Sequence, residues 1–232
     1  METLNDSDEN ADVENINRYI DAMKFKKDIL NLDRKIITFR KKGPGSYYQE
    51  FDLNIAESSN ASKLNTFFTA KLLFEMLKDH GVFKLFHIYV DPDNGNFAIL
   101  YVLFKNYFKN VGVTRKYSLL YMRRSRNDQN ISTFVSVPKP ENDFANENIS
   151  AFLTKVNAIN AEHNIDAKDD ELPLSFTFLS TPHPLCQNRI SIKGVTVIPE
   201  SFQVPEVIEK VALQLVTALV KQSIKGFLSM QL

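Results

Sequence analysis

The sequence predicts an α+β protein, a single domain with an antiparallel β-sheet meander of about eight strands flanked by three main helices. Three observations support this fold class. The chain has 232 residues, of which 44% are hydrophobic, enough for one substantial core. Several short runs alternate apolar and polar residues, as half-buried strands do. Three longer runs place apolar residues at helical spacing.

The first 14 residues contain six acids and no base. Polar segments with one sign of charge cannot bury enough apolar surface to fold alone. We therefore expect a disordered acidic tail over residues 1–14 and a single α+β domain over residues 15–232. Apolar residues recur at helical spacing from about Asp12 to Met23, and a basic stretch over residues 24–42 then ends in a Gly-Pro-Gly turn.

A half-buried strand is predicted over residues 47–55, where apolar and polar side chains alternate. A helix near residues 62–80 follows, because Ser62 can cap its start and Gly81 can end it. The next predicted strands cover residues 84–91, 96–104, 117–122 and 131–137. Residues 97–104 are apolar on both faces, which places this strand at the centre of the sheet.

Two more helices are predicted, near residues 147–163 and 204–225. The first has one apolar face, whereas the second has only a thin polar stripe and should be buried on most of its circumference. We expect the second to pack in the core, with an oligomer interface as the alternative. Two strands lie between these helices, and the apolar phase of the later one changes at Gly194, which indicates a β-bulge.

Basic residues are concentrated in one part of a chain whose 28 bases and 28 acids balance. Seven bases and no acid lie between Asn94 and Asn127. A hairpin of residues 97–108 and 114–124 would bring four of the bases to one end, beside aromatic rings able to stack on nucleobases. The alternative is that these cations only protect wet strand ends. The predicted anion-binding or nucleic-acid-binding residues are Lys105, Lys109, Arg115, Lys116, Tyr107 and Tyr117.

No catalytic or metal-site motif is found in the sequence. The four histidines show no ligand spacing with one another or with Cys186, the single cysteine. Glycine-rich phosphate-binding motifs and the G-x-S-x-G motif are also missing. We therefore predict no catalytic residues, no metal and no cofactor, with an enzyme of an unrecognised class as the weakest alternative.

The leading functional hypothesis is a non-enzymatic binding or assembly protein that self-associates and presents a basic face to an anionic partner, either RNA or an acidic protein. Its Asn, Lys and Ile usage, charge blocks and apolar last helix are what we expect of a small viral structural (matrix-like) or accessory protein. The alternative is an RNA- or single-strand nucleic-acid-binding protein that uses the basic and aromatic hairpin.

The expected location is intracellular and cytoplasmic, with the nucleus as an alternative. A single cysteine excludes an internal disulfide, and the acidic start of the chain is unlike a secretory signal. No run reaches the roughly 20 apolar residues that span a bilayer, so no transmembrane segment is predicted.

Overall fold

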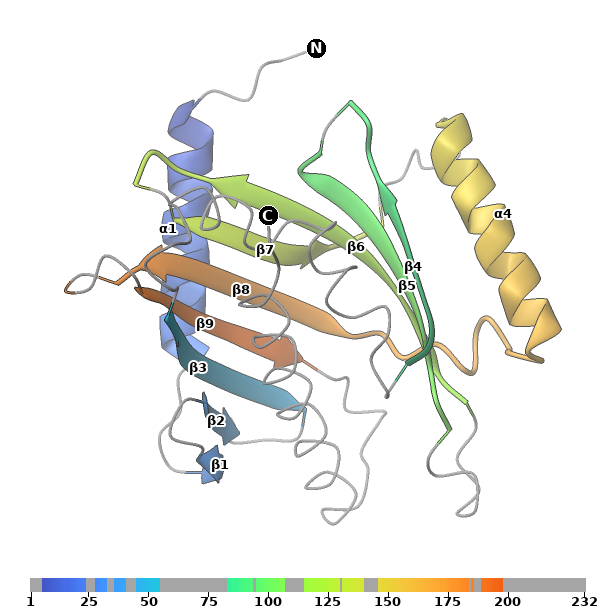
Figure 1. The fold of residues 1–232 in the computed structure, drawn as a ribbon, viewed down its shortest axis with the longest axis horizontal. Helices are drawn as coiled ribbons and strands as arrows, with labels where there is room; N and C mark the ends of the chain where they lie inside the picture. The colour runs from blue at the N-terminus through green and yellow to red at the C-terminus, as the bar shows by residue number, and fades with distance from the viewer. Residues whose placement is uncertain are drawn as a thin grey trace.

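A nine-stranded antiparallel sheet forms the body of the protein (Figure 1). The order of its strands is β1-β2-β3-β9-β8-β7-β6-β5-β4. The strands are β1 (Asp28–Leu32), β2 (Ile36–Arg40), β3 (Ser46–Asn54), β4 (Phe83–Val90), β5 (Phe97–Phe104), β6 (Tyr117–Arg126), β7 (Ser132–Val137), β8 (Ser175–Pro182) and β9 (Arg189–Val197). The computed structural model describes residues 6–23, 28–32, 36–40, 45–54, 83–93, 95–106, 115–129, 131–139, 146–183, 185 and 189–197.

The pairing of β3 with β9 joins the two halves of the sheet. It runs without interruption from Ser46 opposite Val197 to Asn54 opposite Arg189. The strands β4 to β9 follow one another across the sheet in chain order, and β3 then pairs with the last of them. The two halves of the sheet are therefore joined by two strands that lie far apart in sequence.

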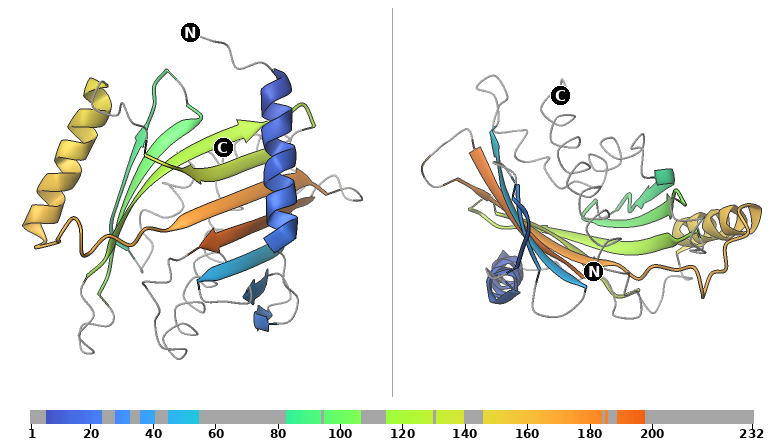
Figure 2. Two further views of the ribbon diagram at one scale, coloured as in Figure 1. Left: turned by 180° about the vertical axis from the view of Figure 1, so that it is seen from behind. Right: turned by 90° about the horizontal axis from the view of Figure 1, so that it is seen from below.

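The sheet is strongly bent, and both described helices lie on the outside of the bend (Figure 2). α1 (Asp6–Met23) contacts β6, β7, β8 and β9. α4 (Glu147–Glu162) packs on β5 and β6 through residues that include Tyr101 and Leu119. Arg123 is bonded to α1. It shares a face of β6 with Leu119 because the two are four positions apart on the strand. We call this face of the sheet convex and the opposite face concave.

α1 is fixed to the convex face by apolar packing and by two ion pairs. Val13 and Ile20 pack with buried residues of β3, β8 and β9. Asp12 binds Arg123 at 2.8 Å, and Asp21 binds Lys193 at 2.7 Å. The acidic character of this segment therefore complements cations of the sheet, and the helix begins at Asp6.

α4 begins at a capped end. The side chain of Asn146 accepts hydrogen bonds from the backbone N–H groups of Asn148 and Ile149, two of the donors that a helix start leaves unpaired. Buried residues of α4, Leu153 and Val156 among them, pack on the convex face. Among the described residues, no helix combines the length and the apolar character that crossing a membrane requires.

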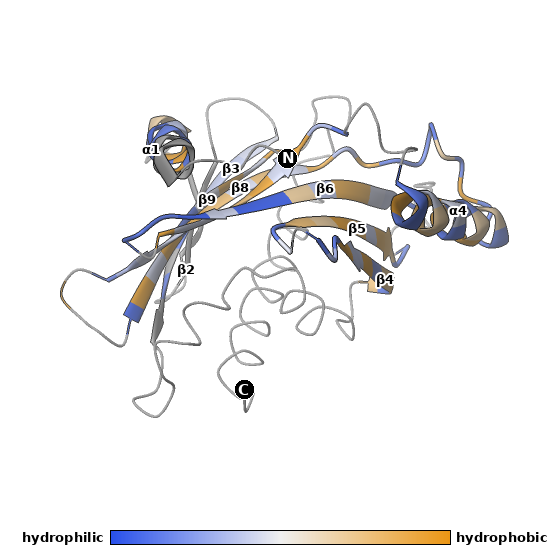
Figure 3. Cartoon of the chain, turned by 90° about the horizontal axis from the view of Figure 1, so that it is seen from above, coloured by the Kyte–Doolittle hydropathy of each residue, from blue (hydrophilic) through white to orange (hydrophobic). Residues whose placement is uncertain are grey.

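The concave face is also apolar. Leu100 on β5, Met122 on β6, Phe134 on β7 and Ile192 on β9 are each at most 3% exposed. The register places all four on the face opposite to α1 and α4. The hydropathy colouring shows how apolar β4, β5 and much of β6 are (Figure 3). Burial on both sides explains the continuous apolar run of β5. The predicted central position is wrong, because β5 lies beside β4, the last strand in the order.

The predicted fold class needs several corrections. The α+β class is correct and α4 confirms the helix near residues 147–163, but the sheet has nine strands instead of eight, and the β3–β9 pairing means that it is not a simple meander. Residues 6–14 are helical instead of belonging to a disordered tail. The helices predicted near residues 62–80 and 204–225 lie outside the described residues, so three flanking helices are not observed. The assignment of residues 15–232 to one domain stays a prediction.

The predicted bulge at Gly194 is also wrong. The pairing of β9 passes through Gly194 in regular register with both β3 and β8. The apolar phase changes there because β9 is buried on both faces: Ile192 lies on the concave face and Val195 packs under α1. Gly194 is required for a different reason, since a Cβ atom at this position would collide with the ring of Phe178.

We expect Gly194→Ala to lower the free energy of unfolding by about 1–3 kcal/mol, the usual cost of overpacking a core. The added methyl group would displace the Phe178 ring, which lies directly over the glycine. Gly95→Ala is the matched control, because a Cβ atom there meets nothing within 4 Å. Urea denaturation of both variants checks the prediction, and equal stability of the two would contradict it.

Candidate functional site

An aromatic cluster lies on the concave face where β7 and β8 meet. Phe134 and Phe178 are cross-strand partners, and Phe176 lies two residues before Phe178 on the same face. The ring centroids of Phe134 and Phe176 are 5.6 Å apart, and those of Phe176 and Phe178 are 5.9 Å apart. Phe134 is buried, whereas Phe176 and Phe178 are half-buried. The cluster therefore offers aromatic surface to a molecule on the concave side.

An apolar surface continues from this cluster across β6, β5 and β4. The register aligns Ile88, Leu100 and Leu120 in one row across the three strands. A second aromatic group follows at the far end, where Phe83 lies 5.6 Å from Phe86 and 5.8 Å from Phe104 between ring centroids. The concave face therefore carries an apolar path with aromatic rings at two places.

Polar side chains are gathered near one end of this path. Ser132 on β7 faces Ser180 on β8, and both are buried. Arg126 on β6 pairs with Ser132, and Arg124 pairs with Phe134 of the aromatic cluster. Gln49 on β3 is buried two strands away from Phe178. A mostly apolar surface with a few polar groups on one side is the usual chemistry of a site for an amphipathic small molecule.

The titratable groups with shifted pKa values that pack under α4 lie on the opposite, convex face. The hydroxyl of Tyr101 donates a hydrogen bond to Asn160 Oδ1 at 2.6 Å, and burial raises its pKa to about 12. The Tyr117 hydroxyl donates to the Ala167 carbonyl oxygen at 2.6 Å, and burial followed by the charge of Glu171 raises its pKa. Burial also raises the pKa of Glu171. These bonds attach the end of α4 and the turn after it to β5 and β6.

The structure gives the predicted anion-binding residues different environments. Lys105 is exposed just beyond β5, and Arg115 is half-buried before β6. Lys116 donates to the Asp169 carbonyl oxygen at 2.9 Å and forms an ion pair with Asp170 at 3.2 Å. Tyr117 is only 4% exposed, so its ring is not available for stacking. The remaining two predicted residues, Lys109 and Tyr107, lie outside the described residues. Anion binding by these six residues stays a prediction.

Sequence reasoning missed the concave face as a candidate site. The signal was present: residues 97–104 are apolar on both faces, yet α4 covers only one. Excess apolar character on the second face indicates that something else packs there, either other parts of the chain or a ligand. The search for charged clusters drew attention to Lys116 instead, whose charge is matched within the fold.

No family model matches the chain, and no curated protein resembles it in sequence. Solved structures share its fold. Human StAR-related lipid transfer protein 5 is 9% identical, with a TM-score of 0.54 over 96% of this chain and 98% of that chain. The lipid transfer and protein localization domain of human StarD13 is 11% identical, with a TM-score of 0.54 over 99% and 100%. A STAR-related lipid transfer protein fragment from Xanthomonas axonopodis is 10% identical, with a TM-score of 0.50 over 86% and 94%.

This shared fold overturns the predicted function and partners. The arrangement is that of lipid transfer domains, so the viral matrix-like or accessory assembly protein and the RNA- or single-strand-binding alternative were wrong. The predicted partners, a second copy of the chain and RNA or an acidic protein, are therefore also unsupported. The physical reason is visible in the hairpin, where Lys116 is paired with the carboxylate of Asp170 and Tyr117 is part of the core.

We expect Lys116→Ala to lower the free energy of unfolding by about 1–3 kcal/mol, because a largely buried carboxylate loses its cation. The side chain of Asp170 is 12% exposed, and this ion pair ties the turn after α4 to the start of β6. Arg18→Ala is the control, since its pair with Glu14 is exposed and should contribute less than about 0.5 kcal/mol. Equal losses in urea denaturation would contradict this assignment.

We expect His87 to make stability depend on pH. Burial, and after it the charge of Lys155, lowers the pKa of His87 below 6.5. The unfolded chain therefore takes up a proton first as the pH falls, and the free energy of unfolding decreases between about pH 7 and pH 5. In urea denaturation, His87→Gln should lose less stability over this range than the wild type, and Lys155→Met, which keeps the burial, an intermediate amount. An unchanged pH dependence in His87→Gln would refute the prediction.

Proposed function

We propose that the protein binds a lipid-like ligand on the concave face of its sheet. The observation that carries this proposal is the half-buried pair Phe176 and Phe178 on a largely apolar face. Each aromatic side chain can contribute a large apolar contact area to a ligand. The likeness to the fold of lipid transfer domains supports the same conclusion, although identity near 10% extends to the fold only.

The geometry favours an elongated ligand with one polar end. An acyl or ring system extending from the aromatic cluster toward Ile88 and Phe104, which are also half-buried, would contact mainly apolar atoms. Removing apolar surface from water gains about 25 cal/mol for each Å², so a long chain gains more than a small one. Ser132 and Ser180 provide hydroxyl groups near the aromatic cluster, where the polar end of the ligand would lie.

A binding role without catalysis is part of this proposal. The convex-face groups with shifted pKa values, Tyr101, Tyr117, Glu171 and His87, are used to pack α4 and its following turn on the sheet. Their perturbation is explained by this packing and does not require a reaction. An intracellular location also remains a proposal, supported by the presence of only one cysteine in the chain.

Binding can be tested by incubating the protein with phosphatidylcholine and phosphatidylserine vesicles, re-isolating it and recording native mass spectra. We expect a lipid to remain bound, and a dansyl-labelled fatty acid to bind saturably. Phe178→Ala should weaken binding of this probe by about five- to thirtyfold, because about 1–2 kcal/mol of apolar contact is lost.

Phe152→Ala is the matched control, since Phe152 is a half-buried phenylalanine of α4 that packs on the convex face. It should leave probe affinity within about twofold, while thermal unfolding shows that each variant is folded. Phe176→Ala provides a second variant in the cluster if Phe178→Ala does not fold. Neither lipid nor probe binding, or equal weakening by the control, would refute the proposal.

A further inference from the structure

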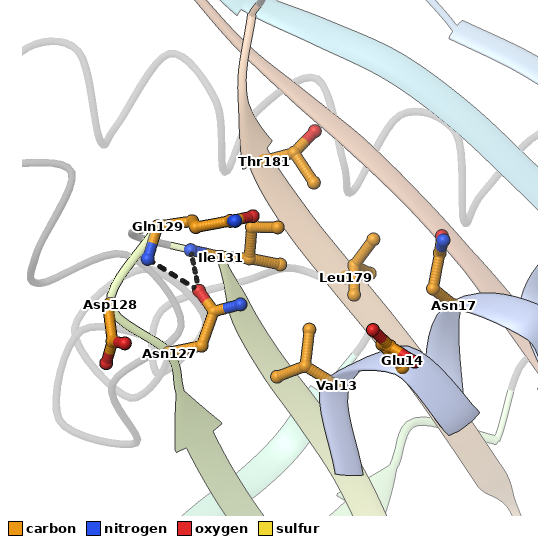
Figure 4. A pocket seen from close by; sticks show the side chains of 9 residues that line it. All are labelled: Val13, Glu14, Asn17, Asn127, Asp128, Gln129, Ile131, Leu179 and Thr181. Carbon is orange, nitrogen blue, oxygen red and sulfur yellow. Dashed lines mark hydrogen bonds between the residues drawn. The ribbon is translucent and has the colours of Figure 1, made fainter. Parts of the chain in front are cut away.

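A groove of about 420 Å³ lies on the convex face, on the other side of the sheet from the proposed lipid site (Figure 4). α1 forms one wall, the turn between β6 and β7 forms the other, and β8 lies between them. The apolar lining residues of the groove are Val13, Ile131 and Leu179, of which Ile131 is half-buried and the other two are at most 4% exposed. A volume of this size is within the usual range for sites that bind small molecules.

The walls carry polar groups that the fold does not use. Asn127 Oδ1 accepts hydrogen bonds from the backbone N–H groups of Gln129 at 3.1 Å and Ile131 at 3.0 Å. These bonds orient the side-chain NH₂ group of Asn127 toward the groove (Figure 4). Within the described part of the chain, the side-chain amides of Asn17 and Gln129 form no hydrogen bond. Amide groups therefore stand on both walls, ready to bind a polar group.

The charge of the groove is negative. Glu14 and Asp128 line it, and no basic residue does so among the lining residues. Glu14 is partly neutralised by Arg18 at 2.9 Å, whereas the exposed Asp128 carboxylate has no ionic partner in the described residues. Asp12 and Asp21 of α1 are paired with Arg123 and Lys193, so the exposed Asp128 supplies the charge that attracts a cation to the groove.

We propose that this groove binds an organic cation on a short aliphatic stem, the chemistry of a lysine or arginine side chain. The stem lies against Ile131, as long basic side chains commonly do on apolar surfaces. The ammonium or guanidinium group lies among the free amides of the walls, at the mouth of the groove beside the turn that carries Asp128. The cation comes either from a peptide of a partner or from a free amine, and both have the same binding chemistry.

Side-chain amide signals of Asn17, Asn127 and Gln129 in nitrogen-15-labelled protein provide the test. Three probes are titrated to about 10 mM: Nα-acetyl-lysine amide, its neutral analogue acetylated also on Nε, and 1-aminopentane. We expect saturable shifts of these signals with the first probe and none with the neutral analogue. Raising the salt concentration should weaken binding, because the charges are exposed to solvent.

Asp128→Asn should weaken binding of Nα-acetyl-lysine amide by about two- to fivefold, the range of an exposed ion pair. Asp93→Asn is the matched control, since it removes one charge from the exposed turn between β4 and β5 and should change nothing. Tighter binding of the lysine amide than of 1-aminopentane would identify a peptide as the source, and equal binding a free amine. No saturable shift, equal shifts with the neutral analogue, or an unaffected Asp128→Asn would overturn the proposal.

Discussion

The fold depends on the antiparallel pairing of β3 with β9. This pairing extends the sheet beyond β9 by three strands and places Tyr48 beside Val195 on the convex face. α1 packs on this pair and on Leu179 of β8. If β3 did not pair there, α1 would lose its contact with Tyr48 but keep Val195 and Lys193 of β9 and Leu179 of β8. Strands formed late in the chain thus position the first helix.

The two faces of the sheet differ in what covers them, and this difference has consequences for binding. α1 and α4 cover the convex face, and both are held by specific polar contacts, Asp12 with Arg123 and Asn160 with Tyr101. The concave face is instead apolar with half-buried phenylalanines. Because the sheet bends toward the concave face, side chains on that face converge, and an elongated apolar molecule lying there would be contacted from several strands (Figure 2).

Local patterns in the sequence predicted the parts of the fold that depend on neighbours in the chain. The apolar run over residues 97–104 marked a strand buried on both faces, although not its place beside the last strand of the sheet, and the apolar face over residues 147–163 marked α4. The structure of α1 could not be predicted in this way. Its acids look like those of a disordered tail until their partners are known, and Arg123 and Lys193 lie 111 and 172 residues away from the acids they bind. The β3–β9 pairing escapes prediction for the same reason.

The environments of the predicted anion-binding residues could not be read from the sequence for a related physical reason. A charged cluster in a sequence shows neither which charges are matched in space nor which aromatic rings are buried, and Lys116 and Tyr117 were chosen without that information. Perturbed pKa values would have been an equally poor guide, because Tyr101 and Tyr117 owe theirs to burial under α4. A lipid-like ligand is bound mainly by apolar contact, which leaves no titratable signature. For this fold the informative feature is therefore apolar surface in excess of what the visible helices cover, and that excess lies around Phe176 and Phe178.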